Sequence, residues 1–76
     1  MNKLEELSRS EIEKAIHEWI IGRNAERDRR ILSIYLFDGL TMAQMQRLLD
    51  AEGIELSIDR IKKIIRVRKE QLFRHL

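Results

Sequence analysis

With 76 residues, no cysteine and no proline, the chain is long enough for one small domain, and disulfides and thiolate metal sites are excluded as sources of its stability. The formal net charge of +2 hides an asymmetry. Residues 57–76 hold seven Lys/Arg and two Asp/Glu, a net of +5, whereas residues 1–56 hold eight and eleven, a net of −3. A basic terminal segment indicates a surface for an anionic partner, with nucleic acid as the leading candidate.

Three glycines mark the ends of helical segments. Gly22, Gly39 and Gly53 each follow a stretch with helical apolar periodicity, and glycine readily adopts the left-handed conformation that commonly ends a helix. They divide the chain into four predicted helices. We therefore predict an all-α, four-helix fold with a single domain over residues 1–76, in which residues 1–9 are a candidate flexible N-terminal arm.

The first predicted helix runs from about Ser10 to Ile21. Two overlapping capping-box patterns stand at its start, Ser10 with Glu13 and Ser8 with Glu11. The helix can therefore begin at either of two places, two residues apart. Five apolar residues recur at helical spacing and predict a buried face: Ile12, Ala15, Ile16, Trp19 and Ile20.

The second predicted helix runs from about Asn24 to Phe37, with Asn24 as its N-cap. Its first half is the charged run Glu26-Arg27-Asp28-Arg29-Arg30, and its second half is dense in apolar residues. A helix that is apolar on nearly every side is expected to be the central element of the fold. For the charged run we favour a mixed solvent-exposed face in which the two acids neutralise the arginines. A second phosphate-binding patch is the alternative.

The third predicted helix starts at Thr41, which forms a capping box with Gln44, and it ends near Glu52. In the connection that follows, Ile54 and Leu56 offer apolar side chains that would fill the corner between helices.

The fourth predicted helix starts at Ser57, as N-cap, and continues to about Arg74. At about 100° per residue, its apolar residues share one side: Ile58, Ile61, Ile64, Ile65, Leu72 and Leu76. Basic residues occupy the other side: Arg60, Lys63, Arg66 and Arg74. The helix is therefore predicted to pack inward through isoleucine and to meet phosphate outward.

The last two predicted helices, joined by a short glycine-containing corner, have the ingredients of a helix-turn-helix. The recognition helix, at about 57–74, is expected to lie in the major groove of duplex DNA. The candidate base-contacting residues are Arg60, Lys63, Arg66 and Val67, because arginine pairs with guanine and valine fits a thymine methyl. The candidate phosphate-contacting residues are Thr41, Gln44, Ser57, Lys62 and Lys69. The competing interpretation is a solvated basic face.

A resemblance agrees with this interpretation. The segments Arg27-Asp28-Arg29-Arg30-Ile31-Leu32 and Tyr35-Leu36-Phe37-Asp38-Gly39-Leu40-Thr41, followed by Met45 and by Ser57-x-x-x-Ile61-Lys62-Lys63-Ile64-Ile65-Arg66, resemble the fourth region of bacterial sigma factors and related phage-type regulators. The likeness covers roughly residues 26–72. It implies sequence-specific DNA binding in a small bacterial or phage transcriptional regulator, with RNA polymerase as a further candidate partner.

The chain departs from the sigma pattern in three ways. The corner from Leu49 to Ser57 is about five residues longer and looks like the turn of transposase DNA-binding domains. Gln46 stands where such motifs usually hold a small residue, and the other regions of a sigma factor are absent.

The sequence also bears on other function classes. No cysteine nucleophile, Gly-rich phosphate loop or metal-binding motif is present, so we expect no enzyme, no metal and no cofactor. The longest uninterrupted apolar runs have three members, against about 20 needed to span a bilayer, and we expect a cytoplasmic chain with no membrane partner. The alternative function is a small helical inhibitor or adaptor that binds a host enzyme or RNA polymerase. A homodimer, through Phe73 and Leu76 or through the first helix, stays open.

Overall fold

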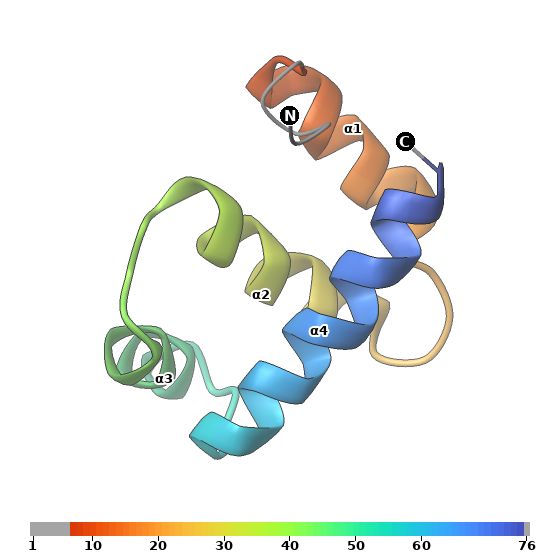
Figure 1. Ribbon diagram of the computed structural model, residues 1–76. Coiled ribbons are helices and arrows are strands. Elements are labelled where there is room, and N and C mark those ends of the chain that lie inside the picture. Colours follow the sequence, from red (N-terminus) through yellow and green to blue (C-terminus); the bar gives the residue numbers. More distant parts are fainter. Residues whose placement is uncertain (1–6, 76) are drawn as a thin grey trace.

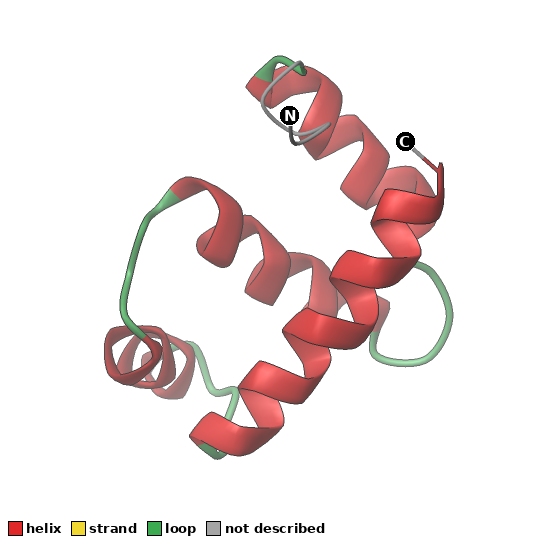
Figure 2. Ribbon diagram, viewed as in Figure 1, coloured by secondary structure: helices red, strands yellow, loops and turns green. Residues whose placement is uncertain are grey.

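The computed structural model describes residues 7–75 as four helices joined by short loops (Figure 1). The helices are α1 (Arg9–Trp19), α2 (Ala25–Phe37), α3 (Met42–Ala51) and α4 (Ile58–His75). Within the described residues there is no strand (Figure 2). The predicted all-α, four-helix class is confirmed.

The start of α1 is set by the upstream of the two capping patterns. The Ser8 Oγ accepts a hydrogen bond from the backbone N–H of Glu11 at 3.2 Å, so the helix begins at Arg9. Leu7 packs, half-buried, against the core just before the cap. Residues 1–6, the remainder of the candidate arm, and Leu76 lie outside the described residues.

The end of α1 differs from the prediction. The helix ends at Trp19, and Ile20 adopts an extended conformation (φ −90°, ψ 94°) instead of continuing the helix. Ile20 is fully buried, whereas Trp19 is 40% exposed and stacks on His75 with ring centroids 4.0 Å apart. The expectation of a buried Trp19 was therefore wrong, because the extended Ile20 turns inward beside it.

At the start of α2, Asn24 occupies the predicted N-cap position but caps in a different way. Its backbone is left-handed (φ 63°), and its side chain makes no capping hydrogen bond. Asparagine tolerates this conformation better than most residues, so the residue serves the chain reversal rather than the helix amides.

The capping box predicted for α3 is confirmed. The Thr41 Oγ1 accepts from the Gln44 N–H at 3.2 Å, and the Gln44 Oε1 accepts from the Thr41 N–H at 2.9 Å. After α3, Gly53 adopts φ +84°, a conformation that costs a residue with a Cβ more than it costs glycine. The glycine therefore directs the chain away from α3 towards α4.

Two hydrophobic clusters form the core, and α2 and α4 contribute to both. The first joins α2, α3 and α4: Ile31, Ile34, Met45, Leu49, Ile61, Ile64 and Ile65. The second joins α1, α2 and α4: Ile12, Ala15, Ile16, Ile20, Leu32 and Leu72. The predicted central role of α2 is confirmed, since α2 packs in both clusters. α4 runs across α2, with α3 near its N-terminal end and α1 near its C-terminal end (Figure 1).

A two-pronged ion pair ties α2 to the end of α3. The Arg30 Nε and Nη2 donate to the two carboxylate oxygens of Glu52, at 2.9 and 2.6 Å. These hydrogen bonds lower the pKa of Glu52 below its ordinary value of 4.5 and raise the pKa of Arg30. Such a geometry is the strongest that arginine and a carboxylate form.

This pair predicts a dependence of stability on pH. Because the pKa of Glu52 is lower in the folded chain than the ordinary 4.5, its stabilisation is fully present above pH 4.5 and is lost as the pH falls through the folded value. The melting temperature of the unaltered chain should therefore exceed that of Glu52→Gln at pH 7, and the gap should close below pH 4.5. Thermal melts of both chains across that range test it. A gap that stays constant would show that the pair does not titrate as described.

Candidate nucleic-acid interface

α4 presents a basic face because its apolar residues are used inward. The Ser57 Oγ accepts from the Arg60 N–H at 3.1 Å and fixes the start of the helix, as predicted. Ile61, Ile64, Ile65 and Leu72 are buried, each at most 7% exposed, and follow one another at intervals of three, one and seven residues. The opposite side of the helix is therefore turned to solvent.

The structure brings the candidate base-contacting residues together on this outward side. Arg60, Lys63 and Arg66 are exposed, and Val67 is 41% exposed. Within residues 7–75, the side chains of the three cations make no hydrogen bond or ion pair. Their charges are therefore not neutralised by a carboxylate of the described chain.

The candidate phosphate-contacting residues at the helix starts already serve as caps. Thr41 and Gln44 bond to each other's backbone in the capping box, and the Ser57 Oγ accepts from the Arg60 amide. Each keeps side-chain donor capacity, namely two hydroxyl protons and the Gln44 amide group. These residues are exposed at the starts of α3 and α4.

The two candidate lysines differ in their surroundings. Lys62 is exposed, without an ion pair in the described chain. Lys69 is half-buried, and its Nζ lies 5.5 Å from the ring centroid of Tyr35 and 6.0 Å from that of Phe73. Cation–π attraction holds the Lys69 ammonium near these rings without neutralising it.

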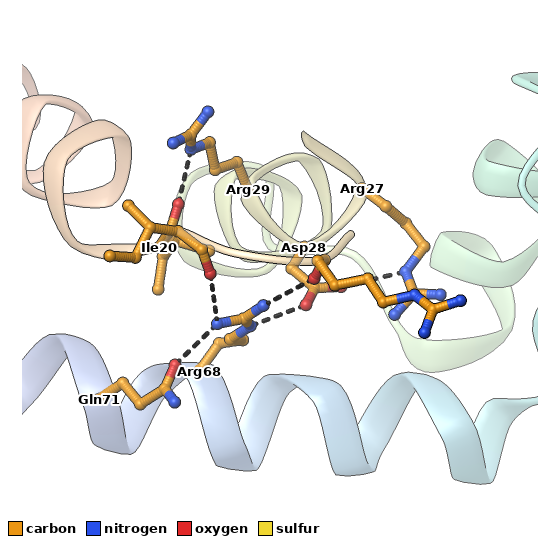
Figure 3. A network of polar contacts seen from close by, with 8 residues as sticks. Ile20, Arg27, Asp28, Arg29, Arg68 and Gln71 are labelled. Atoms are coloured by element: carbon orange, nitrogen blue, oxygen red, sulfur yellow. Dashed lines mark hydrogen bonds and ion pairs between the residues drawn. The ribbon is translucent and has the colours of Figure 1, made fainter. Parts of the chain in front are cut away.

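Arg68 is the basic residue of α4 that turns inward. Its Nε donates to the Asp28 Oδ2 at 2.7 Å, and its Nη1 donates to the Gln71 Oε1 at 2.9 Å (Figure 3). Its Nη1 and Nη2 also donate to the main-chain carbonyls of Ile21 and Arg23, both at 3.2 Å. Arg68 thus fastens α4 to the α1–α2 loop and to the first turn of α2.

Asp28 corrects the interpretation of the charged run. The sequence indicated a solvent-exposed acid, but Asp28 is only 4% exposed and accepts from both Arg68 and Arg27, the latter at 3.0 Å (Figure 3). A buried carboxylate needs charged partners, and the nearer one comes from 40 residues away in sequence. The apolar spacing of α4 indicated that Arg68 faces inward, since Arg68 lies four residues from each of the buried Ile64 and Leu72, but it did not indicate the partner of Arg68.

The other two arginines of the run also have separate structural roles. Arg29 donates to the carbonyl of Ile20 at 2.9 Å (Figure 3). It also donates to the carbonyl of His17 at 3.0 Å, at the C-terminal end of α1. Carbonyls at a helix end lack partners within the helix and attract cations. Arg30 is held by Glu52. Three of the five residues of the run, Asp28, Arg29 and Arg30, are therefore tethers between elements, so the run is not simply the mixed solvent-exposed face that was expected.

The corner between α3 and α4 is fixed by the residue that departs from the usual motif. The Gln46 Nε2 donates to the main-chain carbonyl of Leu56 at 3.0 Å, and Ile54 and Leu56 pack against the first cluster. A side-chain amide thus holds the longer connection, which a small residue at position 46 would leave without this bond.

Comparisons with models of known protein families, with curated proteins and with solved structures gave no match to this chain. The resemblance to the fourth region of sigma factors stays a prediction. In the described residues, no group of three or more His, Asp or Glu side chains is placed to hold a metal ion, and no helix is long and apolar enough to cross a membrane.

Proposed function

We propose that the protein binds duplex DNA sequence-specifically as a small bacterial or phage transcriptional regulator. In this proposal α3 and α4 act as a helix-turn-helix, and α4 is the recognition helix in the major groove. The observation that carries the proposal is the outward face of α4. There Arg60, Lys63 and Arg66 are exposed and unpaired within residues 7–75. A cytoplasmic location belongs to the same proposal.

The distribution of carboxylates supports this assignment. Arg68 and Arg74, the two α4 cations with carboxylate partners, are bound by Asp28 and Glu70. The other five basic residues of the segment 57–76 have no ion pair in the described chain: Arg60, Lys62, Lys63, Arg66 and Lys69. A helix that served only solubility would gain from alternating charges, whereas a concentration of one sign attracts a polyanion.

The first test of the proposal removes two base-contacting candidates. Arg60→Ala together with Lys63→Ala should abolish specific binding, since each good bidentate contact contributes about 1–3 kcal/mol of base discrimination. The melting temperature should hardly change, because both side chains are exposed. Binding is measured by fluorescence anisotropy on a duplex selected from a random pool with the unaltered chain.

A matched control separates contact from net charge. Arg9→Ala with Lys14→Ala also removes two exposed cations, from α1, and each of these pairs with a glutamate of its own helix. The control variant should keep the base preference. Equal binding by the Arg60/Lys63 variant and the unaltered chain would move the recognition surface off this face of α4.

A protein-binding function is the second candidate, and one observation favours it. Trp19, Ile21 and Val67 are large apolar residues that are 40%, 62% and 41% exposed. An inhibitor or adaptor would use such anchors in contact with a host enzyme or RNA polymerase. The two functions differ in salt dependence. DNA affinity should fall steeply as salt rises, whereas an adaptor should show little affinity for DNA at physiological salt.

Self-association would show in the DNA site. If the protein acts as a dimer, through Phe73 and the C-terminal end or through α1, the selected sequence should be a two-fold repeat with half-sites about one helical turn apart. A monomer should select a single asymmetric site.

A further inference from the structure

A shallow groove of about 530 Å³ runs beside α4, between this helix, the α1–α2 loop and the first turn of α2. Its cationic lining comes from three elements: Arg23 from the loop, Arg27 from α2, and Arg60, Lys63 and Arg68 from α4. Among the described residues, Asp28 is the one carboxylate that lines the groove. The groove therefore brings basic side chains that are far apart in sequence together in one positively charged concavity.

The single carboxylate does not neutralise the groove. Asp28 is engaged by the Nε atoms of Arg68 and Arg27, and five cations against one acid leave a formal charge of +4. Arg27 uses only its Nε in this bond, so its terminal nitrogens keep their donors. Arg23 and Lys63 make no ion pair in the described chain. The groove thus offers several unspent donors to an anion.

The position of the groove relative to α4 indicates which anion it fits. A helix of about 10–12 Å diameter fills a major groove about 12 Å wide, so its two flanks face the backbones of the two strands. By helical spacing, Lys62 and Lys69 lie on one flank, and Arg60 and Val67 lie at the opposite edge of the base-contacting face, where the protein groove begins. Both strands would therefore meet cations.

We propose that this groove binds phosphates of the second DNA strand, with Arg23 and Arg27 as the contacting residues. The inference rests on the proposed function and adds to it a phosphate site outside the recognition helix and the two helix starts. Arg23 lies on the α1–α2 loop and Arg27 on α2, to the side of α4. With α4 in the major groove, this side faces the sugar-phosphate backbone of a DNA strand and not the edges of the base pairs. They contribute affinity and register rather than sequence preference.

The contacts of Arg68 prepare this site. By donating to the carbonyls of Ile21 and Arg23 at 3.2 Å, Arg68 holds the main chain of the loop against α4. The loop that carries Arg23 is thus positioned by the fold before any anion arrives, which reduces the ordering cost of binding.

The test compares R23Q/R27Q with the unaltered chain on the selected duplex. The slope of log K against log salt should decrease by about 1.8, since each phosphate contact in B-DNA contributes about 0.9. The ranking of duplex sequences should stay the same. Phosphate-ethylation interference should disappear at positions on one strand only. The control R9Q/K14Q, which removes two charges from α1, should retain those positions and most of the slope.

Two further comparisons make the result decisive. R23Q alone, whose side chain has no partner in the described chain, should lower the slope by about half as much, and it carries the test if loss of the Arg27–Asp28 bond weakens the fold. An unaltered slope and footprint for R23Q/R27Q, with binding by the parent chain intact, overturns the second-strand site and favours a protein partner for the groove. Absence of DNA binding by the parent chain overturns the proposed function together with this inference.

Discussion

Asp28→Ala is expected to lower the free energy of unfolding by about 3–5 kcal/mol, the usual effect of removing one partner from a buried ion pair. The change leaves Arg68, whose side chain is 14% exposed, with an uncompensated charge beside the core. A domain of 76 residues typically has about 4–11 kcal/mol of stability in total. The variant should therefore lose a large fraction of that stability, as urea denaturation followed by circular dichroism would show.

The matched control uses an exposed ion pair within α4, the helix that carries Arg68. Glu70→Ala breaks the Arg74–Glu70 contact, whose side chains are 67–71% exposed, and should change the stability by less than about 1 kcal/mol. Asp28→Leu with Arg68→Met should recover much of the loss, because apolar residues of similar volume commonly replace a buried pair without penalty. Asp28→Ala and Glu70→Ala with equal effects would contradict a structural role for the buried pair.

Ile61→Asp is expected to unfold the domain. Ile61 is fully buried in the first cluster, where a carboxylate would lose its hydration and find no cation placed to receive it. The conservative Ile61→Val should cost only about 0.5–1.5 kcal/mol. Far-ultraviolet circular dichroism of both variants checks this, with Arg66→Asp as a control that places the same charge on the exposed face. Helical Ile61→Asp with cooperative unfolding would show that α4 does not pack as described.

The helices could be predicted from the sequence because their signals are local. The Thr41/Gln44 capping box, the Ser57 cap and the isoleucine spacing of α4 depend on residues three or four apart, and all three were confirmed. The end of α1 was missed by two residues, because apolar periodicity continues through Ile20 and Ile21 although the backbone becomes extended there.

The tertiary ion pairs could not be predicted in the same way. Asp28 and Arg68 are 40 residues apart, and Arg30 and Glu52 are 22 apart, so no local spacing links either pair. A charged residue among other charged residues is predicted to be solvent-exposed unless the packing of distant helices is known. The outward face of α4 was easier, because it is the complement of an apolar stripe that the sequence displays.

The groove beside α4 depends on the same long-range packing. Arg23 and Arg27 join Arg60 and Lys63 only because α2 crosses α4 and the α1–α2 loop is held against it. The sequence placed Arg27 in a charged run for which a second phosphate-binding patch was the alternative interpretation, and Arg23 carried no signal.

The placement of α4 on two separate hydrophobic clusters has a mechanical consequence. Ile61, Ile64 and Ile65 anchor the N-terminal half of α4 in the first cluster, and Leu72 anchors its C-terminal half in the second. The helix is therefore held at two separate places along its length. A helix held at two places cannot rotate as a rigid body about a single point of attachment to the rest of the domain. The entropic cost of positioning the backbone of α4 is therefore met during folding, and a ligand that binds its basic face has only the exposed side chains left to order.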